Sequence, residues 1–199
     1  MSRRLTRCGL VVAALLPLAS ALQAQLGEVQ LGALASYGTG RAYGPGAGLV
    51  FGLAAGRLTY IGLRWAYHAG ATTDYPSSLP ASPATRVRTR VQLYAVDLGV
   101  LVPVGGVEIV PGVSVGAVRF SQTATQGAGA TATRSSRHDG QFLAAPGVAV
   151  HVPLSRVTLI PEAQYSLSGS PKLPWPVKHR GLLVSVRLVI TFEARRIRR

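Results

Sequence analysis

The stretch GLLVSVRLVITFEARRIRR, residues 181–199, decides which kind of β protein this chain forms. Its apolar side chains alternate with Ser185, Arg187 and Thr191, and a period of two predicts a strand. Arg187 is then either a charge placed in a buried strand or a luminal charge on a membrane strand. The opposite parity carries six apolar side chains, namely Leu182, Val184, Val186, Leu188, Ile190 and Phe192.

The N-terminus indicates an exported protein. MSRRLTR is a basic region, CGLVVAALLPLASAL is a short apolar region, and cleavage sites follow Ala21 and Ala24. This is the anatomy of a signal peptide, which we assign to residues 1–24. Its removal takes away Cys8, the only cysteine, so we expect a mature chain without disulfides.

The mature chain is strongly basic and long enough for one domain. We expect a barrel over residues 25–192, followed by a basic tail over residues 193–199. No stretch after the signal peptide reads as a membrane helix, because prolines, glycines and charges interrupt each apolar run. An exported apolar chain without helices is either a soluble β protein, for example of lipocalin type, or an outer-membrane β-barrel.

Seven further segments show the same alternation and bring the predicted strands to eight. They are residues 26–38, 46–56, 58–70, 86–102, 107–120, 141–152 and 156–168.

The connections between the predicted strands alternate between long and short. The short turns are Gly56-Arg57, 103–106 and 153–156, and the long polar connections are 38–46, 70–85, 121–140 and 169–180. Outer-membrane barrels keep short turns at the periplasmic end and long loops outside, whereas a sandwich does not sort its loops in this way. The sequence therefore predicts an all-β fold, an eight-stranded antiparallel up-and-down transmembrane β-barrel.

The phrases VEIVPGVSVGAV, VTLIPEAQYSLS and LLVSVRLVITF resemble strands of the small eight-stranded outer-membrane β-barrels, the superfamily of the OmpA transmembrane domain. The resemblance implies a monomer in the bacterial outer membrane, inserted by the barrel-assembly machinery. Such barrels typically end on an aromatic residue, whereas here EARRIRR follows Phe192. The group includes anchors, adhesins, narrow pores and a few lipid-modifying enzymes, so the resemblance does not identify an activity.

Three prolines interrupt predicted strands, namely Pro111, Pro146 and Pro161. A closed barrel has no free edge for a residue without an N–H. We therefore expect bulges or locally broken ladders at these positions.

Charges on the inward parity predict a luminal network. Its expected members are Glu28, Arg64, Asp97, Glu108, Glu162 and Arg187, with Glu108 or Glu162 as the partner of Arg187. An eight-stranded barrel is just wide enough for side chains to fill it, and buried charges persist when paired. The alternative is a catalytic or ion-conducting site formed by Glu108, Glu162 and Arg187.

Basic residues gather at the ends of strands that carry long loops, where we expect contacts with the phosphates of outer-membrane lipids, including lipopolysaccharide. An ordinary solvated loop surface is the alternative, and nucleic acid is not an expected partner for an exported chain. The candidates are Arg86, Arg88, Arg90, Arg134, Arg137, Lys178 and Arg180, with Arg119 and Lys172 nearby.

The sequence offers little that suggests catalysis. Its histidines lack metal-ligand spacing, we expect no metal or cofactor, and no G-x-S-x-G elbow accompanies His138-Asp139. We therefore expect a structural or interaction-type barrel with a filled lumen and no enzymatic activity. A narrow channel or transporter for small or apolar solutes is the main alternative, followed by a lipid-modifying barrel enzyme.

Overall fold

The computed structural model describes residues 26–55, 58–76, 84–127 and 132–193. The predicted signal peptide, the Gly56-Arg57 turn and most of the basic tail lie outside these ranges. In the described part no helix is long and apolar enough to cross a membrane. The strands are β1 (Leu26–Gly38), β2 (Gly44–Ala55), β3 (Thr59–His68), β4 (Thr72–Tyr75), β5 (Thr85–Val100), β6 (Val102–Val104), β7 (Val107–Gln126), β8 (Thr133–Leu154), β9 (Val157–Ser168) and β10 (Gly181–Glu193).

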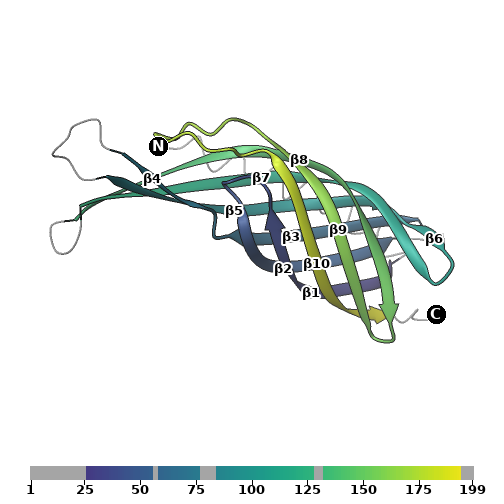
Figure 1. The fold of residues 1–199 in the computed structure, drawn as a ribbon. Helices are drawn as coiled ribbons and strands as arrows, with labels where there is room; N and C mark the ends of the chain where they lie inside the picture. Colours follow the sequence, from purple (N-terminus) through teal and green to yellow (C-terminus); the bar gives the residue numbers. More distant parts are fainter. Residues whose placement is uncertain (1–25, 56–57, 77–83, 128–131, 194–199) are drawn as a thin grey trace, which may run out of the picture.

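Eight of these strands close into a barrel (Figure 1). Each long strand pairs antiparallel with its neighbour, from β1–β2 through β9–β10, with β4 and β6 as short additions. β1 also pairs with β10, with Leu34 opposite Arg187, and this pairing closes the cylinder. The predicted all-β, eight-stranded, up-and-down antiparallel barrel is confirmed.

The two parities of each strand face different surroundings, as the alternation predicts. On β10 the side chain of Arg187 is 2% exposed, whereas Leu188 on the next position is 56% exposed. Large apolar side chains on the outer surface, with arginines and carboxylates buried in the interior, are the reverse of a soluble fold and match a barrel surrounded by lipid. The outer wall therefore provides the membrane-facing surface.

The apolar band has the height that a membrane requires. Along β5 and β6 every outward residue from Tyr94 to Val104 is apolar and exposed. Ten residues at about 3.3 Å per residue and a tilt of about 40° span about 25 Å. This equals the usual height of the apolar band of an outer-membrane barrel.

The prolines break ladder pairs without shifting the register. Between β8 and β9 the pairing runs from Gly147 opposite Gln164 to Ala144 opposite Leu167 and omits Pro146. The same ladder omits the rung at Pro161, and the rung at Pro111 is the gap that separates β5 from β6. Of the two expected outcomes, broken ladders occur at the prolines and bulges do not. The single strand predicted over residues 86–102 is therefore divided between β5 and β6.

Two of the predicted long loops contain strands. β7 continues to Gln126 and β8 begins at Thr133, so most of the predicted loop 121–140 is a hairpin. β4 lies within the predicted loop 70–85 and pairs with the start of β5. These segments are rich in Thr and Ser and lack an apolar face, so the alternation of apolar residues does not reveal them. With the upper parts of β5, β7 and β8, β4 forms a sheet that projects beyond the barrel (Figure 1), here named the extension.

Candidate functional site

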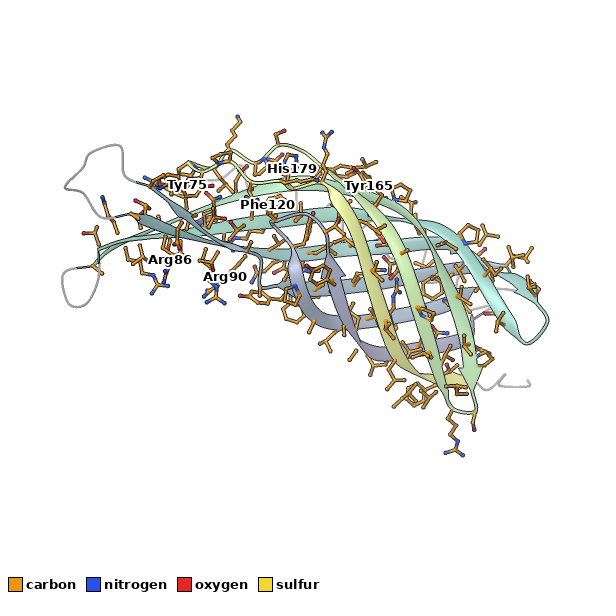
Figure 2. The ribbon with its side chains drawn as sticks, viewed as in Figure 1. Tyr75, Arg86, Arg90, Phe120, Tyr165 and His179 are labelled. Atoms are coloured by element: carbon orange, nitrogen blue, oxygen red, sulfur yellow. The ribbon has the colours of Figure 1, made fainter. Side chains whose placement is uncertain are left out.

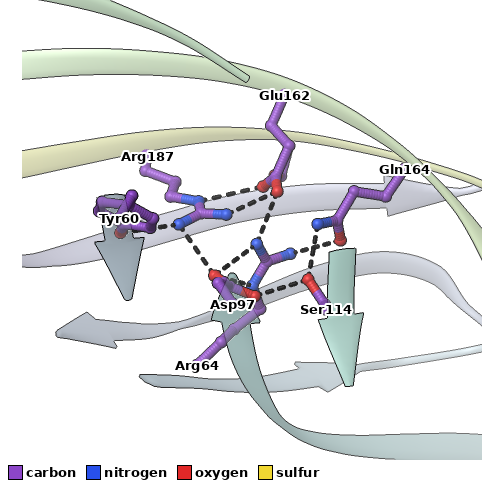
Figure 3. Close-up of polar contacts among 8 residues, drawn as sticks. Tyr60, Arg64, Asp97, Ser114, Glu162, Gln164 and Arg187 are labelled. Atoms are coloured by element: carbon purple, nitrogen blue, oxygen red, sulfur yellow. Dashed lines mark hydrogen bonds and ion pairs between the residues drawn. The ribbon is translucent and has the colours of Figure 1, made fainter. Parts of the chain in front are cut away.

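A cluster of buried charges lies in the middle of the lumen (Figure 3). Arg64 comes from β3, Asp97 from β5, Glu162 from β9 and Arg187 from β10. All four point into the lumen from two pairs of adjacent strands, β3 with β5 and β9 with β10, so the fold brings together charges that are far apart in the sequence. None is more than 7% exposed.

Glu162 accepts hydrogen bonds from both arginines. Arg187 donates Nε to Glu162 Oε2 at 3.0 Å and Nη2 to Oε1 at 2.6 Å, a bidentate arrangement. Arg64 donates Nη2 to Glu162 Oε1 at 2.7 Å. Ser185 adds a hydrogen bond of 2.8 Å from its hydroxyl to Glu162 Oε2.

Asp97 is the second bridging carboxylate. Arg64 Nη2 lies 2.8 Å and Arg187 Nη1 3.0 Å from Asp97 Oδ2. Ser114 donates its hydroxyl to Asp97 Oδ1 at 2.6 Å. Gln164 completes the ring, because its amide oxygen accepts from Arg64 Nη1 at 2.9 Å and its amide nitrogen donates to Ser114 at 2.6 Å.

The network is neutral, because two guanidiniums balance two carboxylates. Burying unpaired charge is costly, and a low-dielectric interior tolerates ions when they are paired and fully hydrogen-bonded. Both carboxylates meet this condition. The arrangement stabilises a fixed side-chain geometry across the lumen.

Two predicted members do not join the network. The side chain of Glu28 is exposed, and Glu108 is half-buried with its Oε2 3.7 Å from Nδ1 of His151. Both residues lie near the end of the barrel that carries the short turns, whereas Arg187 lies in the middle of β10. Parity gives the face of a strand but not the height along it, so Glu162 is the partner of Arg187 and Glu108 is not.

The sequence reasoning missed an apolar layer above the charges. Tyr43, which follows β1, is buried beside Phe120, with ring centroids 6.3 Å apart, and beside His68 at 5.4 Å. Its hydroxyl lies 2.6 Å from that of Ser166. The inward parity of Val91, Leu93, Val118 and Leu143 is the signal that could have revealed this layer.

Below the charges the lumen narrows to a small void. Tyr60 receives a hydrogen bond of 3.4 Å from Arg187 Nη1 and meets the ring of His151 edge-on, with centroids 5.3 Å apart. The cavity beside these residues has a volume of about 20 Å³. A volume of this size holds roughly one water molecule.

The segment 169–180 covers the inner face of the extension (Figure 2). Gln122 on β7 exchanges two hydrogen bonds with the backbone of Trp175, at 2.9 and 3.3 Å. The Trp175 ring lies against Tyr75 of β4, with centroids 4.7 Å apart. Asp139 of β8 accepts a hydrogen bond of 2.7 Å from the Lys172 backbone N–H. This bond and a second from Gln141 hold the pKa of Asp139 below its usual range.

The seven basic candidates occupy three different places. Arg86, Arg88, Arg90 and Arg134 share the outward parity, Arg137 lies on the opposite face of β8, and Lys178 and Arg180 belong to the segment 169–180. Figure 2 shows Arg86 and Arg90 on the side of the extension away from His179. The candidates therefore do not form one cluster.

One arginine of this set is paired. Arg86 Nε donates to Asp74 Oδ1 at 2.9 Å, and this bond lowers the pKa of the Asp74 carboxyl. Both side chains are well exposed, so the pair adds little to stability.

The sequence pair His138-Asp139 is not arranged for hydrolysis. His138 and Asp139 are consecutive residues of β8 and therefore face opposite sides of the sheet. Asp139 uses its Oδ2 for Gln141 and Lys172 rather than for a histidine.

Comparisons with known proteins identify the fold. No family model matches the chain, and no curated protein matches it. The solved structure of a major outer membrane protein from Thermus thermophilus is similar, with a TM-score of 0.60 and 15% identity over 83% of this chain and 99% of that one. Ail, the attachment invasion locus protein of Yersinia pestis, was solved with the heparin analogue sucrose octasulfate. It gives a TM-score of 0.50 and 11% identity over 84% of this chain and 99% of that one. The chain therefore has the fold of the small eight-stranded outer-membrane β-barrels, as the resemblance in its sequence implies.

Proposed function

We propose that this protein is a structural and interaction-type barrel of the bacterial outer membrane, with a lumen that does not conduct. It holds a rigid, basic sheet above the membrane surface and carries out no reaction of its own. The observation that carries the proposal is the ring of charges that bridges the lumen between Arg64, Asp97, Glu162 and Arg187.

Closure is supported at three levels along the axis. Tyr43 and Phe120 fill the upper lumen, the charges fill the middle, and Tyr60 with His151 narrows the lower part. The internal void beside the charges is about 20 Å³, which is far too small for a hydrated ion. A transported solute would have to displace paired charges from each other.

The extension supports the interaction role. Its inner face is covered by the segment 169–180, while its outer face presents arginines to the surroundings. Hydrogen bonds along four strands and the ring contact of Trp175 with Tyr75 make it a preformed surface. Preformed surfaces bind with a small ordering cost.

Single-channel recording in a planar bilayer tests the proposal. The wild-type protein should give no discrete conductance steps at neutral pH. The surface variant Arg156→Gln, which leaves the lumen unchanged, should give none either. Discrete steps from purified wild-type protein, absent from a blank preparation, would favour the narrow channel over the closed barrel. Mass analysis of outer-membrane lipids with and without the protein tests the enzymatic alternative, and an altered lipid species would contradict our proposal.

A further inference from the structure

The outer wall of the barrel contains a shallow apolar groove. It has a volume of about 480 Å³ and crosses β1, β2, β3, β5 and β7. Its lining includes the outward side chains of Leu49, Leu63, Trp65, Tyr94 and Val115. This volume is in the usual range for ligand sites, and the lining is almost entirely apolar.

Three arginines stand above this groove on the same face of the wall. Arg88 and Arg90 follow the parity of Tyr94 on β5, and Arg119 on β7 is opposite Gln92, two residues above Tyr94. From the strand rise and a tilt of about 40°, Arg119 lies about 5 Å and Arg90 about 10 Å above the level of Tyr94. By the same rise Arg88 lies about 15 Å above Tyr94. Tyr94 marks the top of the apolar band, so Arg119 lies at the level of lipid headgroups, and Arg90 and Arg88 lie on the outer side of that level.

No Asp or Glu side chain of the chain is placed to form an ion pair with these three arginines. Of its seven acidic residues, Asp74 pairs with Arg86, and Asp97 and Glu162 are in the lumen. Asp139 faces the segment 169–180, while the remaining three glutamates lie near the opposite end of the strands. Among the described residues no ion pair involves Arg88, Arg90 or Arg119.

Arg90 also carries an unused donor. Its side chain is half-buried, and its Nε has no accessible surface and no hydrogen-bond partner in the part of the chain that the structure describes. A buried donor without a partner is costly, and an arginine fork matches the oxygens of a phosphate. The unpaired charges of the three arginines point to an anionic ligand with several oxygens, whereas the covered Nε of Arg90 would contact such a ligand only after the side chain moves.

We propose that this wall binds a phosphorylated acyl lipid of the outer leaflet, with its phosphate at Arg88, Arg90 and Arg119 and one acyl chain in the groove. Charge-assisted hydrogen bonds to the phosphate select the lipid. An acyl chain gains no hydrophobic energy on leaving other lipid, so the groove contributes close packing and holds the chain in register. The site does not depend on whether the lumen conducts.

The two tryptophans of the chain make the site measurable. Trp65 lines the groove, and Trp175 lies in the segment 169–180 and can be removed as Trp175→Phe. The Trp175→Phe protein is reconstituted in phosphatidylcholine vesicles that contain brominated-chain phosphatidic acid or brominated-chain phosphatidylcholine. Bromine quenches tryptophan fluorescence on contact, so the ratio of the two quenching curves gives the preference of the groove for the anionic lipid.

We expect phosphatidic acid to be preferred at Trp65 by about fivefold for each arginine that binds the phosphate. The triple variant Arg88→Gln, Arg90→Gln, Arg119→Gln should bring the preference close to one. The control variant Arg41→Gln, Arg137→Gln, Arg156→Gln removes the same charge from exposed positions elsewhere, with Arg137 on the opposite face of β8, and should retain it. Equal quenching by both lipids in the Trp175→Phe protein, or the same loss in both triple variants, would overturn the proposal.

A groove-filling variant tests the role of the acyl chain. Val115→Phe fills part of the groove without changing charge, and it should lower quenching of Trp65 by the anionic lipid at least twofold. Unchanged quenching would show that the headgroup alone binds, and the groove would then have no part in the site. Retention of the heat-dependent mobility shift of folded barrels on gels verifies that each variant is folded.

Discussion

Replacing Arg187 by methionine should destabilise the barrel strongly, because the substitution leaves two buried carboxylates with one arginine. In the wild type Arg187 binds Glu162 through two hydrogen bonds and lies 3.0 Å from Asp97. After the substitution Arg64 is the one arginine left in contact with both carboxylates, and the network carries a net charge of minus one. Breaking a buried ion pair from one side costs about 3–5 kcal/mol, and we expect this loss in the free energy of unfolding.

The double variant Arg187→Met, Glu162→Gln isolates the charge contribution. Each single substitution leaves the network with an unbalanced charge, whereas the double variant keeps the neutral pair of Arg64 and Asp97. The double variant should therefore be more stable than the sum of the single losses predicts, with a coupling of about 2 kcal/mol. Methionine and glutamine preserve most of the side-chain volume, so cavity effects stay small.

Urea unfolding in lipid vesicles, followed by the heat-dependent mobility shift and by circular dichroism, measures these differences. Arg156→Met on the exposed turn between β8 and β9 is the matched control and should change stability by less than about 0.5 kcal/mol. The account of the network would be refuted if Arg187→Met had no larger effect than this control. Strictly additive single losses would equally refute it.

Three further predictions address the layers around the network. Tyr43→Phe removes the hydrogen bond with Ser166 and should cost about 1 kcal/mol in urea unfolding; a cost below about 0.3 kcal/mol would show that this bond does not matter. The Asp139 pKa is lowered, so the carboxylate holds the Lys172 amide at neutral pH and releases it as pH falls through the depressed value. The NMR shift of that amide should therefore titrate below the ordinary value of about 3.9, and a midpoint at or above it would contradict the contact. Gly116→Ala would place a Cβ on a backbone carbonyl of the neighbouring strand, so it should cost about 1–3 kcal/mol and widen the local strand spacing; wild-type stability would refute this.

The barrel could be predicted from the sequence because lipid imposes a simple rule on each strand. Val186 and Leu188 face outward and Arg187 inward, and the same parity rule assigns Asp97 and Glu162 to the lumen. The alternation of short and long connections then gave the topology. These signals are local, so they can be read without knowing which strands are neighbours.

The composition of the network could not be predicted, because it depends on the position of each residue along the barrel axis as well as on the strand face that carries it. Strand tilt and register bring Asp97 beside Arg64 and leave Glu108 near His151 at another level. A one-residue change in register would move every side chain to the other face, and parity alone does not fix the height at which strands meet. The extension was missed for another reason, since its Thr- and Ser-rich strands lie outside the apolar band and lack an apolar face.

Hydrogen exchange of the arginine Nε–H groups tests the central claim most directly. In a closed lumen the Nε–H groups of Arg64 and Arg187 donate to carboxylates and are shielded from water. NMR of the protein in nanodiscs at neutral pH should show slowly exchanging Nε–H signals for Arg64 and Arg187, and the signal of Arg187 should be lost in Arg187→Met. If every arginine Nε–H exchanged at the rate of an exposed side chain, the lumen would be open to water and the account would be contradicted.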